Sequence, residues 1–242
     1  MISLISAWHP EERYIERFLE YYRKNKDTFS ELVLICNGQP SSNLKNLIYA
    51  DDNVKLVVIK KKDFSLFWNS AAEKCKEEWI LLLAPDEILD GCGLDELKKS
   101  NFNKNFIYCF RRKNLFNKRF YKNVFPIEKQ ERLFHYQDRW KNQIHEVIDS
   151  NKERIMLGGM ICHDCYNNWS HVFQKSKSYI PLEAKRYGFL KVTLKSFYMI
   201  LSETKTLPIY IKDGFFGLSW YCYSVLFWLR VLIFRIRKSI WS

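Results

Sequence analysis

The chain has little of what a secreted, disulfide-bonded protein needs. Its seven cysteines are odd in number and scattered along 242 residues, which does not fit a disulfide framework and is typical of a reducing, cytosolic setting. The N-terminus has no basic region ahead of its apolar residues, and its apolar run is too short for a signal peptide. We therefore expect the first residues to form a core strand.

Acidic residues are also scarce. The chain has 27 Asp and Glu against 39 Lys and Arg, which gives a formal net charge of +12. This balance predicts an anionic partner, which could be nucleic acid, a phosphate-rich substrate or an acidic membrane surface. Hydrophobic residues make up 47% of the chain, enough to bury a large core in one domain with an appendage.

The first 90 residues alternate apolar strands with helices. We expect strands at 2–7, 31–36, 54–59 and 79–83, and helices at about 10–25 and 65–76. Strands separated by helices at this spacing predict a parallel sheet with right-handed crossovers. The last of these strands runs straight into Asp86 and Glu87. Because ligands of open α/β sheets lie beyond the carboxyl ends of the strands, these two acids are predicted to lie where a ligand binds.

The rhythm changes after residue 90. Short β-like segments are expected at 106–111, 116–121, 131–136 and 144–148, as a mixed sheet along one side of the site. Residues 169–202 are typical of two helices with a break at Gly188. Residues 214–234 are mostly apolar and aromatic, and their single charge is Arg230. This segment is long enough to span a bilayer.

Both flanks of the 214–234 segment are basic, so a preferred orientation across a bilayer is not indicated. We favour a helix in the membrane interface, ahead of a buried core helix and of a true span. The aromatic side chains that suit headgroup depth are Trp220, Tyr221, Tyr223, Trp228 and Trp241.

Five short motifs follow one another along the chain: Leu83-Ala84-Pro85-Asp86-Glu87, Gln130-Glu131-Arg132-Leu133-Phe134, His145-Glu146, Gly159-Met160-Ile161-Cys162-His163 and Asp213-Gly214-Phe215-Phe216-Gly217. On these motifs the chain resembles a family 2 glycosyltransferase with the GT-A fold, and most of all the branch of lipopolysaccharide-core glucosyltransferases of the WaaE or KdtX type. The resemblance covers nearly the whole chain. It implies an α/β fold with a mixed, mainly parallel central sheet and flanking helices. It also implies a catalytic domain at 1–168 and C-terminal, membrane-associating helices at 169–242.

The acidic motif implies a divalent cation, Mg²⁺ or Mn²⁺, because a hard cation binds carboxylate and diphosphate oxygens together. Asp86 is the best candidate ligand and is assigned to catalysis through it; Glu87 is a weaker ligand or a support, and His163 a further candidate. The first acid of the family motif is Ala84 here, so metal dependence is weak or water and diphosphate complete the site. Cys162 to Cys165 also allows a zinc interpretation, but no second cysteine pair at close spacing completes four ligands.

The resemblance also implies the residues of a donor site, which are Ala7, Asn37, Asn69, Asp86 and Glu87. Asn37 stands where the family often has Asp, and its amide can still hydrogen-bond a base or ribose. Trp68 replaces the Arg of a family Arg-Asn pair, which removes one phosphate contact. Lys60, Lys61 and Lys62 either compensate for this loss or form a solvated face.

An inverting sugar transfer needs a carboxylate that takes the proton of the acceptor hydroxyl. Glu128 stands two residues before Gln130, where the family has Asp, and is predicted to be this base; Glu131 and Glu146 are alternatives. A solvated Glu128 that balances Lys129 is an interpretation of nearly equal weight.

Contacts to the acceptor or to phosphate are predicted for Gln130, Arg132, His145 and Glu146. The Arg132 guanidinium can bind a phosphate or carboxylate in two places, or it forms an ion pair with Glu131 or Glu128. His145 and Glu146 lie in an apolar segment, so we expect one of them to face the cleft.

The leading hypothesis is therefore an inverting glycosyltransferase that moves a hexose, with glucose as the first guess, from a UDP-sugar to a lipid-linked or lipopolysaccharide-core acceptor. Its predicted location is the cytoplasmic face of the inner membrane, against an anionic lipid surface. One alternative is a catalytically degenerate GT-A protein that binds glycolipid or scaffolds an assembly. Nucleic-acid binding is a third hypothesis, based on the positive charge of the chain. No recognised nucleic-acid-binding motif accompanies it, so we expect no nucleic-acid partner.

Overall fold

The computed structural model describes residues 1–8, 14–36, 38–40, 42–49, 51–59, 64–141, 147–185 and 188–240. The chain forms two compact units. Unit 1 comprises Met1–Lys113 and Glu128–His163, and unit 2 comprises Asn114–Ile127 and Asp164–Ser242. From the sequence we expect a division after residue 168, whereas unit 2 begins at Asp164 and also contains residues 114–127.

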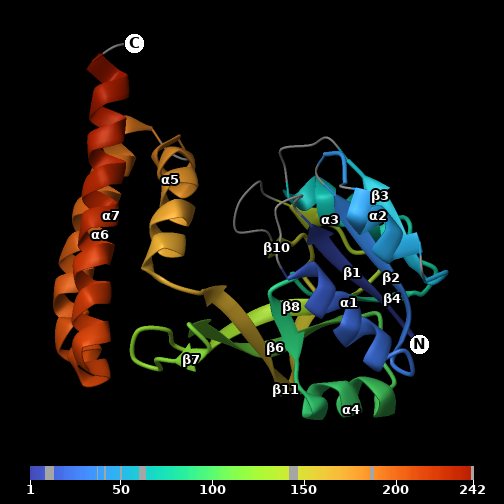
Figure 1. Cartoon of the computed structure of the whole chain (residues 1–242). Coiled ribbons are helices and arrows are strands. Elements are labelled where there is room, and N and C mark those ends of the chain that lie inside the picture. The colour runs from blue at the N-terminus through green and yellow to red at the C-terminus, as the bar shows by residue number, and fades with distance from the viewer. Residues whose placement is uncertain are drawn as a thin grey trace. The chain divides into compact units, whose positions relative to one another are not determined.

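Unit 1 begins with four parallel strands, β1 (Ile2–Trp8), β2 (Phe29–Cys36), β3 (Val54–Val58) and β4 (Trp79–Leu82), in the order β3-β2-β1-β4. The helices between them are α1 (Ile15–Lys24), α2 (Ser42–Tyr49) and α3 (Phe64–Ala72) (Figure 1). The expected alternation of strands and helices is confirmed. Among these seven elements α2 has no expected counterpart, and neither do β5 (Glu87–Leu89) and α4 (Gly91–Lys99) further along the chain.

The other half of the sheet is largely antiparallel. It contains β8 (Glu128–His135), β6 (Phe106–Phe116), β11 (Glu153–Tyr166) and β5 (Glu87–Leu89), in this order after β4, and β7 (Arg119–Phe120) pairs with β6. Helix α4 (Gly91–Lys99) follows β5, and β9 (Trp140–Lys141) and β10 (Val147–Ile148) form a separate two-stranded sheet. The fold class, a mixed α/β sheet with flanking helices and a C-terminal apolar helix, is confirmed.

The apolar strands show no polar alternation because both faces of the sheet are covered. One face packs on α1 and α4 through residues such as Leu4, Leu34 and Leu81. The next residue along two of these strands, Ile5 and Ile35, packs instead on the other face against α3. The buried strands therefore carry the site at their ends rather than on an open face.

Two expected segments of the second half differ from the structure. Residues 106–111 and 116–121 are not separate strands, because β6 runs without a break from Phe106 to Phe116 and β7 is short. Strand β11, 14 residues long, was not expected, since it contains Gly158 and Gly159, which weaken a strand pattern. Gly159 has φ of +80°, and a Cβ there would lie 2.4 Å from the backbone of Gly93, so β11 can pass close to α4 only with glycine.

Unit 2 contains α5 (Trp169–Lys185), α6 (Phe189–Tyr210), a 3₁₀ turn at Ile211–Asp213 and α7 (Gly214–Ile240). The expected break between two helices at Gly188 is confirmed. The α6–α7 hairpin turns sharply at Gly214, with φ of +65°, and a Cβ at Gly217 would lie 1.7 Å from the carbonyl oxygen of Tyr210. The two glycines of the Asp-Gly-x-x-Gly motif thus allow the tight turn.

Asp213 of the same motif binds residues of unit 2 that precede it by about 90 positions. Its carboxylate accepts hydrogen bonds from the backbone N–H of Asn123 (3.0 Å) and Val124 (3.1 Å) and from the side-chain amide of Asn123 (2.8 Å). Phe216 stacks on Tyr121 with a centroid distance of 3.8 Å. The turn of the hairpin is therefore attached to the 121–125 segment.

Among the described residues, one helical segment, Phe189–Arg237, is long and apolar enough by length and composition to cross a membrane. From the sequence, five aromatic residues in and just after this segment are expected at the depth of the lipid headgroups. In the structure, three of them pack partly buried against other residues of unit 2. Trp220 and Tyr223 pack with Phe125 and Trp169, and Trp228 packs in a second cluster of unit 2. Tyr221 is half-buried, and Trp241 lies outside the described residues.

Candidate functional site

The acidic motif after β4 forms a turn that the Glu87 side chain closes. The backbone N–H of Glu87 donates to the carbonyl oxygen of Ala84 (2.9 Å), and the backbone N–H of Ala84 donates back to Glu87 Oε2 (3.0 Å). Asp86, between them, projects from this turn. Because the Glu87 carboxylate binds the backbone of residue 84, the turn keeps its form although alanine stands there.

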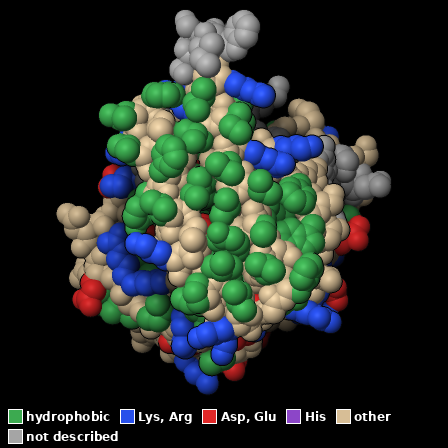
Figure 2. Space-filling view, turned by 90° about the vertical axis from the view of Figure 1, so that its left-hand side faces the viewer, with side chains coloured by type: hydrophobic (Ala, Val, Ile, Leu, Met, Phe, Trp, Pro, Cys, Tyr) green, Lys and Arg blue, Asp and Glu red, His purple; other side chains and the backbone are tan. Residues whose placement is uncertain are grey.

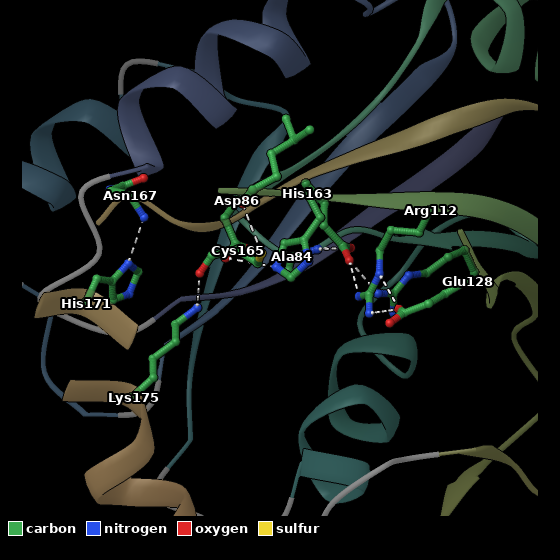
Figure 3. Close-up of polar contacts among 12 residues, drawn as sticks. Ala84, Asp86, Arg112, Glu128, His163, Cys165, Asn167, His171 and Lys175 are labelled. Carbon is green, nitrogen blue, oxygen red and sulfur yellow. Dashed lines mark hydrogen bonds and ion pairs between the residues drawn. The ribbon is translucent and has the colours of Figure 1, made fainter. Parts of the chain in front are cut away.

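Strand β11 brings His163 to this turn. His163 is the direct antiparallel partner of Glu87, and its Nε2 lies 3.3 Å from Asp86 Oδ2 (Figure 3). Both side chains are about five-sixths buried, with 17% of His163 and 13% of Asp86 exposed. The structure thus brings together the two residues predicted to bind a metal.

Glu87 itself is fully buried between two arginines. Arg112 Nη1 of β6 and Arg132 Nη2 of β8 both donate to Glu87 Oε1, at 2.8 and 2.7 Å. Burial alone would raise the pKa of Glu87, but the positive charges of Arg132, His163 and Arg112 outweigh it and lower the pKa to about 2. Glu87 is therefore an anion that holds the two arginines, and the predicted supporting role fits its contacts better than direct contact with a donor.

Arg132 reaches Glu87 from an irregular position in β8. Tyr108 pairs with Leu133 while the next residue, Cys109, pairs with Glu131, so Arg132 is the extra residue of a β-bulge. Its ion pair is with Glu87 rather than with Glu131 or Glu128, the two partners considered from the sequence. Among the described residues its Nε is buried and has no hydrogen-bond partner.

Arg112 links Glu87 to Glu128, which faces it across the β6–β8 pair. Arg112 Nη2 lies 2.5 Å and Nε 3.2 Å from Glu128 Oε2 (Figure 3). Gln130 Nε2 donates to the same oxygen at 3.1 Å. Burial would lower the pKa of Arg112, but Glu87 and Glu128 raise it. The Glu128 side chain remains 39% exposed. We call Asp86, Glu87, Arg112, Glu128, Gln130, Arg132 and His163 the polar cluster.

Sequence reasoning missed Arg112. It stands in a basic run beside Arg111 and Lys113, which is typical of a solvated strand face. Only the β6–β8 register, which the sequence does not specify, puts it opposite Glu128.

Other predicted residues have different contacts. The Asn69 amide both donates to and accepts from the backbone of Trp140, at 3.0 and 2.8 Å, and so attaches α3 to β9. Ala7, near the end of β1, packs against the core next to α3. Trp68, in place of the family Arg, is buried in that core. Glu131, the alternative base, binds Arg154 Nε at 3.0 Å and the backbone N–H of Ile148 at 3.1 Å.

Some predicted residues lie outside the described part of the chain. They are Asn37, Lys60, Lys61, Lys62, His145 and Glu146. Their assigned roles stay predictions.

At the turn after β4, Asp86 and His163 are two side chains that could ligate a divalent cation. Mg²⁺ and Mn²⁺ are commonly held by one or two carboxylates together with substrate phosphates and water. The described residues contain no group of three His, Cys, Asp or Glu side chains that could hold a metal ion. Asp86 with His163 could thus supply two ligands, and the remainder would come from diphosphate and water.

No protein-family model matches the chain, and no curated protein matches it. Solved structures similar to it include TarS of S. aureus, with 9% identity and a TM-score of 0.46 over 76% of this chain and 40% of that one. The neighbours include glycosyltransferases. A second structure of TarS, residues 1–349, is matched over 65% of its length, so the chain spans less than two thirds of either TarS structure.

Two further structures are similar at the same low level of identity. One is 4-diphosphocytidyl-2C-methyl-D-erythritol synthase, with 10% identity and a TM-score of 0.39 over 56% of this chain and 76% of that one. The other is glucosyl-3-phosphoglycerate synthase from Mycobacterium tuberculosis in complex with Mn²⁺, UDP and glucosyl-3-phosphoglycerate, with 12% identity and a TM-score of 0.34 over 48% of this chain and 44% of that one.

Proposed function

We propose that the chain is an inverting glycosyltransferase that moves a hexose from a UDP-sugar to a lipid-linked or lipopolysaccharide-core saccharide. The proposal locates the reaction at the cytoplasmic face of the cytoplasmic membrane. The observation that carries it is the polar cluster beyond the carboxyl end of β4, where Asp86 and His163 meet beside an anion that fixes two arginines. The five ordered motifs support the same activity.

The partly exposed Glu128 is the proposed base. Arg112 and Gln130 bind its Oε2 and so orient the carboxylate, which takes the proton of the acceptor hydroxyl. The freed hydroxyl oxygen forms the new bond to the anomeric carbon as the bond from that carbon to the diphosphate oxygen breaks. UDP departs with the electron pair of the broken bond.

The arginines and the Asp86–His163 pair are proposed to meet the charge on the departing diphosphate. The buried Nε of Arg132, without a partner among the described residues, is a donor suited to an anion. A divalent cation bound by Asp86 and His163 would supply further charge neutralisation there.

The first experiment measures the melting temperature of the detergent-solubilised chain with a panel of nucleotide sugars, with and without Mn²⁺ or Mg²⁺. A donor at about 100 times its Kd stabilises the chain by about 2.7 kcal/mol, which raises Tm by roughly 5–10 °C. We expect one UDP-sugar to do so only with metal. Asp86→Ala should abolish the shift, whereas Asp95→Ala, an exposed aspartate of α4, should keep it.

A second candidate function is that of a degenerate GT-A protein that binds glycolipid without transfer. Ala84 in the acidic motif favours it, as does the absence of a third metal-ligating side chain beside Asp86 and His163 in the described part of the chain. No shift with any donor would favour this candidate and contradict the transferase.

A further inference from the structure

Helices α6 and α7 share an exposed apolar surface (Figure 2). Leu190, Leu194 and Leu201 on α6 and Phe215, Leu226 and Ile233 on α7 are between 48% and 85% exposed. On α6 the spacing of four, then seven residues keeps these side chains on one side of the helix. We call the surface that these six residues mark the outer apolar face.

The opposite sides of the two helices are occupied by protein. Val192 of α6 and Val231 of α7 are buried together with Ile180 and Ala184 of α5. Further along α7, Trp220 packs on Trp169 and Phe125. In the most apolar 18-residue window of Phe189–Arg237, only 17% is buried inside the structure. The outer apolar face is thus one-sided, and the intramolecular packing does not use it.

On α6, α7 and the turn between them, the exposed charged side chains among the described residues are all cations. From residue 189 to the end of the sequence there are two acids, Glu203 and Asp213. Glu203 accepts a hydrogen bond from Tyr210 (3.0 Å), and Asp213 binds Asn123. The cations Lys191, Lys205, Lys212, Arg230 and Arg237 are exposed. An apolar face with exposed cations along its helices complements an anionic lipid surface.

We propose that the outer apolar face binds an anionic membrane surface, with the α6–α7 hairpin lying in the plane of the interface. The surface differs from the one expected from the sequence, since α6 supplies half of it and Trp220 and Trp228 point into unit 2. The proposal extends the proposed function, which needs access to a lipid-linked acceptor.

The contacts of the α6–α7 hairpin with the rest of unit 2 favour an orientation parallel to the membrane surface. The turn is attached to the 121–125 segment through Asp213, and α7 packs along α5. A hairpin crossing the bilayer would carry α5, which packs along α7 and exposes Lys177 and Lys185, into the hydrocarbon, where charged side chains are costly. Lying in the plane leaves them in water.

Vesicle flotation tests the proposal with the full chain. We expect binding to vesicles of phosphatidylcholine with phosphatidylglycerol, and much weaker binding to phosphatidylcholine alone or in high salt. Leu194→Glu and Leu226→Glu should each weaken partitioning about tenfold or more, because each puts a charge where an apolar group enters the membrane. Met156→Glu, which changes a 43% exposed residue of unit 1, is the matched control and should bind as wild type does.

Neutralising the cations of α7 and of the preceding turn tests the proposal independently. Lys212→Gln and Arg237→Gln should each weaken binding to the anionic vesicles about fivefold, since a cation near such a surface contributes about 1 kcal/mol. Lys104→Gln on unit 1 should have no effect. Equal binding of all variants would overturn the proposal, as would concentration-dependent self-association without vesicle binding, which would assign the face to a second copy of the chain.

Two exposed native cysteines report which surface meets the lipid. Cys222 lies on α7, and Cys92 lies on α4. Bound vesicles should protect Cys222 from a membrane-impermeant maleimide and leave Cys92 reactive. Protection of Cys92, or continued reactivity of Cys222 on bound chains, would contradict the proposed face. These measurements involve no sugar transfer, so the membrane proposal and the proposed function can fail separately.

Discussion

Glu87 is the buried charge on which the polar cluster depends. Its folded pKa of about 2 is below the ordinary value of 4.5, so its contribution to stability is fully present above pH 4.5 and is lost as the pH falls toward 2. The difference corresponds to about 3 kcal/mol. We expect Glu87→Gln to be less stable than wild type at pH 7 by an amount of this order, because it removes the anion that Arg112 and Arg132 share and leaves Arg112 with Glu128 alone.

Urea unfolding of both proteins between pH 7 and pH 3 measures this effect. The stability gap between wild type and Glu87→Gln should narrow as the pH falls below 4.5, since only wild type loses the Glu87 contribution. Glu153→Gln, an exposed glutamate of β11, provides the control and should follow wild type throughout. A gap that stays constant with pH would show that Glu87 is not ionised at low pH in the folded state.

The α6–α7 hairpin depends on the close approach of Gly217 to the Tyr210 carbonyl. Gly217→Ala would place a methyl group 1.7 Å from that oxygen, so the turn must open or shift. We expect a loss of stability of about 2 kcal/mol or more, in the range of other strained or overpacked substitutions. Gly188→Ala, at the N-cap of α6 with open space around its Cβ position, should lower stability by less than about 1 kcal/mol, since alanine is only the poorer cap.

Thermal unfolding followed by circular dichroism distinguishes the two variants. A Gly217→Ala protein as stable as Gly188→Ala would mean that the hairpin turn adapts to a side chain at position 217.

The elements predictable from the sequence are those with a strong local pattern. The parallel strands have unbroken apolar runs, such as Leu32–Ile35, because helices cover both faces of the sheet. Strand β11 has no such run and includes two glycines, so only its partners β6 and β5 define it. Helix α2 (Ser42–Tyr49) is short, and its composition does not indicate a helix; only its position between two parallel strands does.

The grouping of side chains in the polar cluster was predictable in part, while their roles stay predictions. Asp86, Glu87, Glu128, Gln130, Arg132 and His163 come from recognisable motifs, and the structure brings all six together. Arg112 could not be predicted because its role depends on register, and the orientation of Arg132 depends on a bulge. Asn69 keeps its predicted place on a helix, but its amide is bound to the Trp140 backbone.

At the scale of the whole molecule, the two units have separate hydrophobic clusters and separate proposed ligands. Hydrogen exchange measured by mass spectrometry should therefore show two independent patterns of protection. A bound UDP-sugar should slow exchange in peptides from 84–89 and 128–135. Anionic vesicles should slow exchange within 189–237, the segment that carries the outer apolar face.

A matched control for this experiment is the Asp86→Ala variant, measured with the UDP-sugar and with vesicles. It should lose the first pattern and keep the second, since Asp86 belongs to unit 1. Protection of 189–237 by the nucleotide sugar alone would contradict a donor site formed by residues of unit 1.

The inward packing of the tryptophans in unit 2 has an optical consequence. Trp169, Trp220 and Trp228 lie among other aromatic rings, and Lys195 sits 5.2 Å from the centre of the Trp228 ring. Their fluorescence reports the integrity of the helical packing, so lipid docking on the far side of α6 and α7 should leave their emission maximum in place. A dye attached to Cys222, in contrast, would change colour on docking.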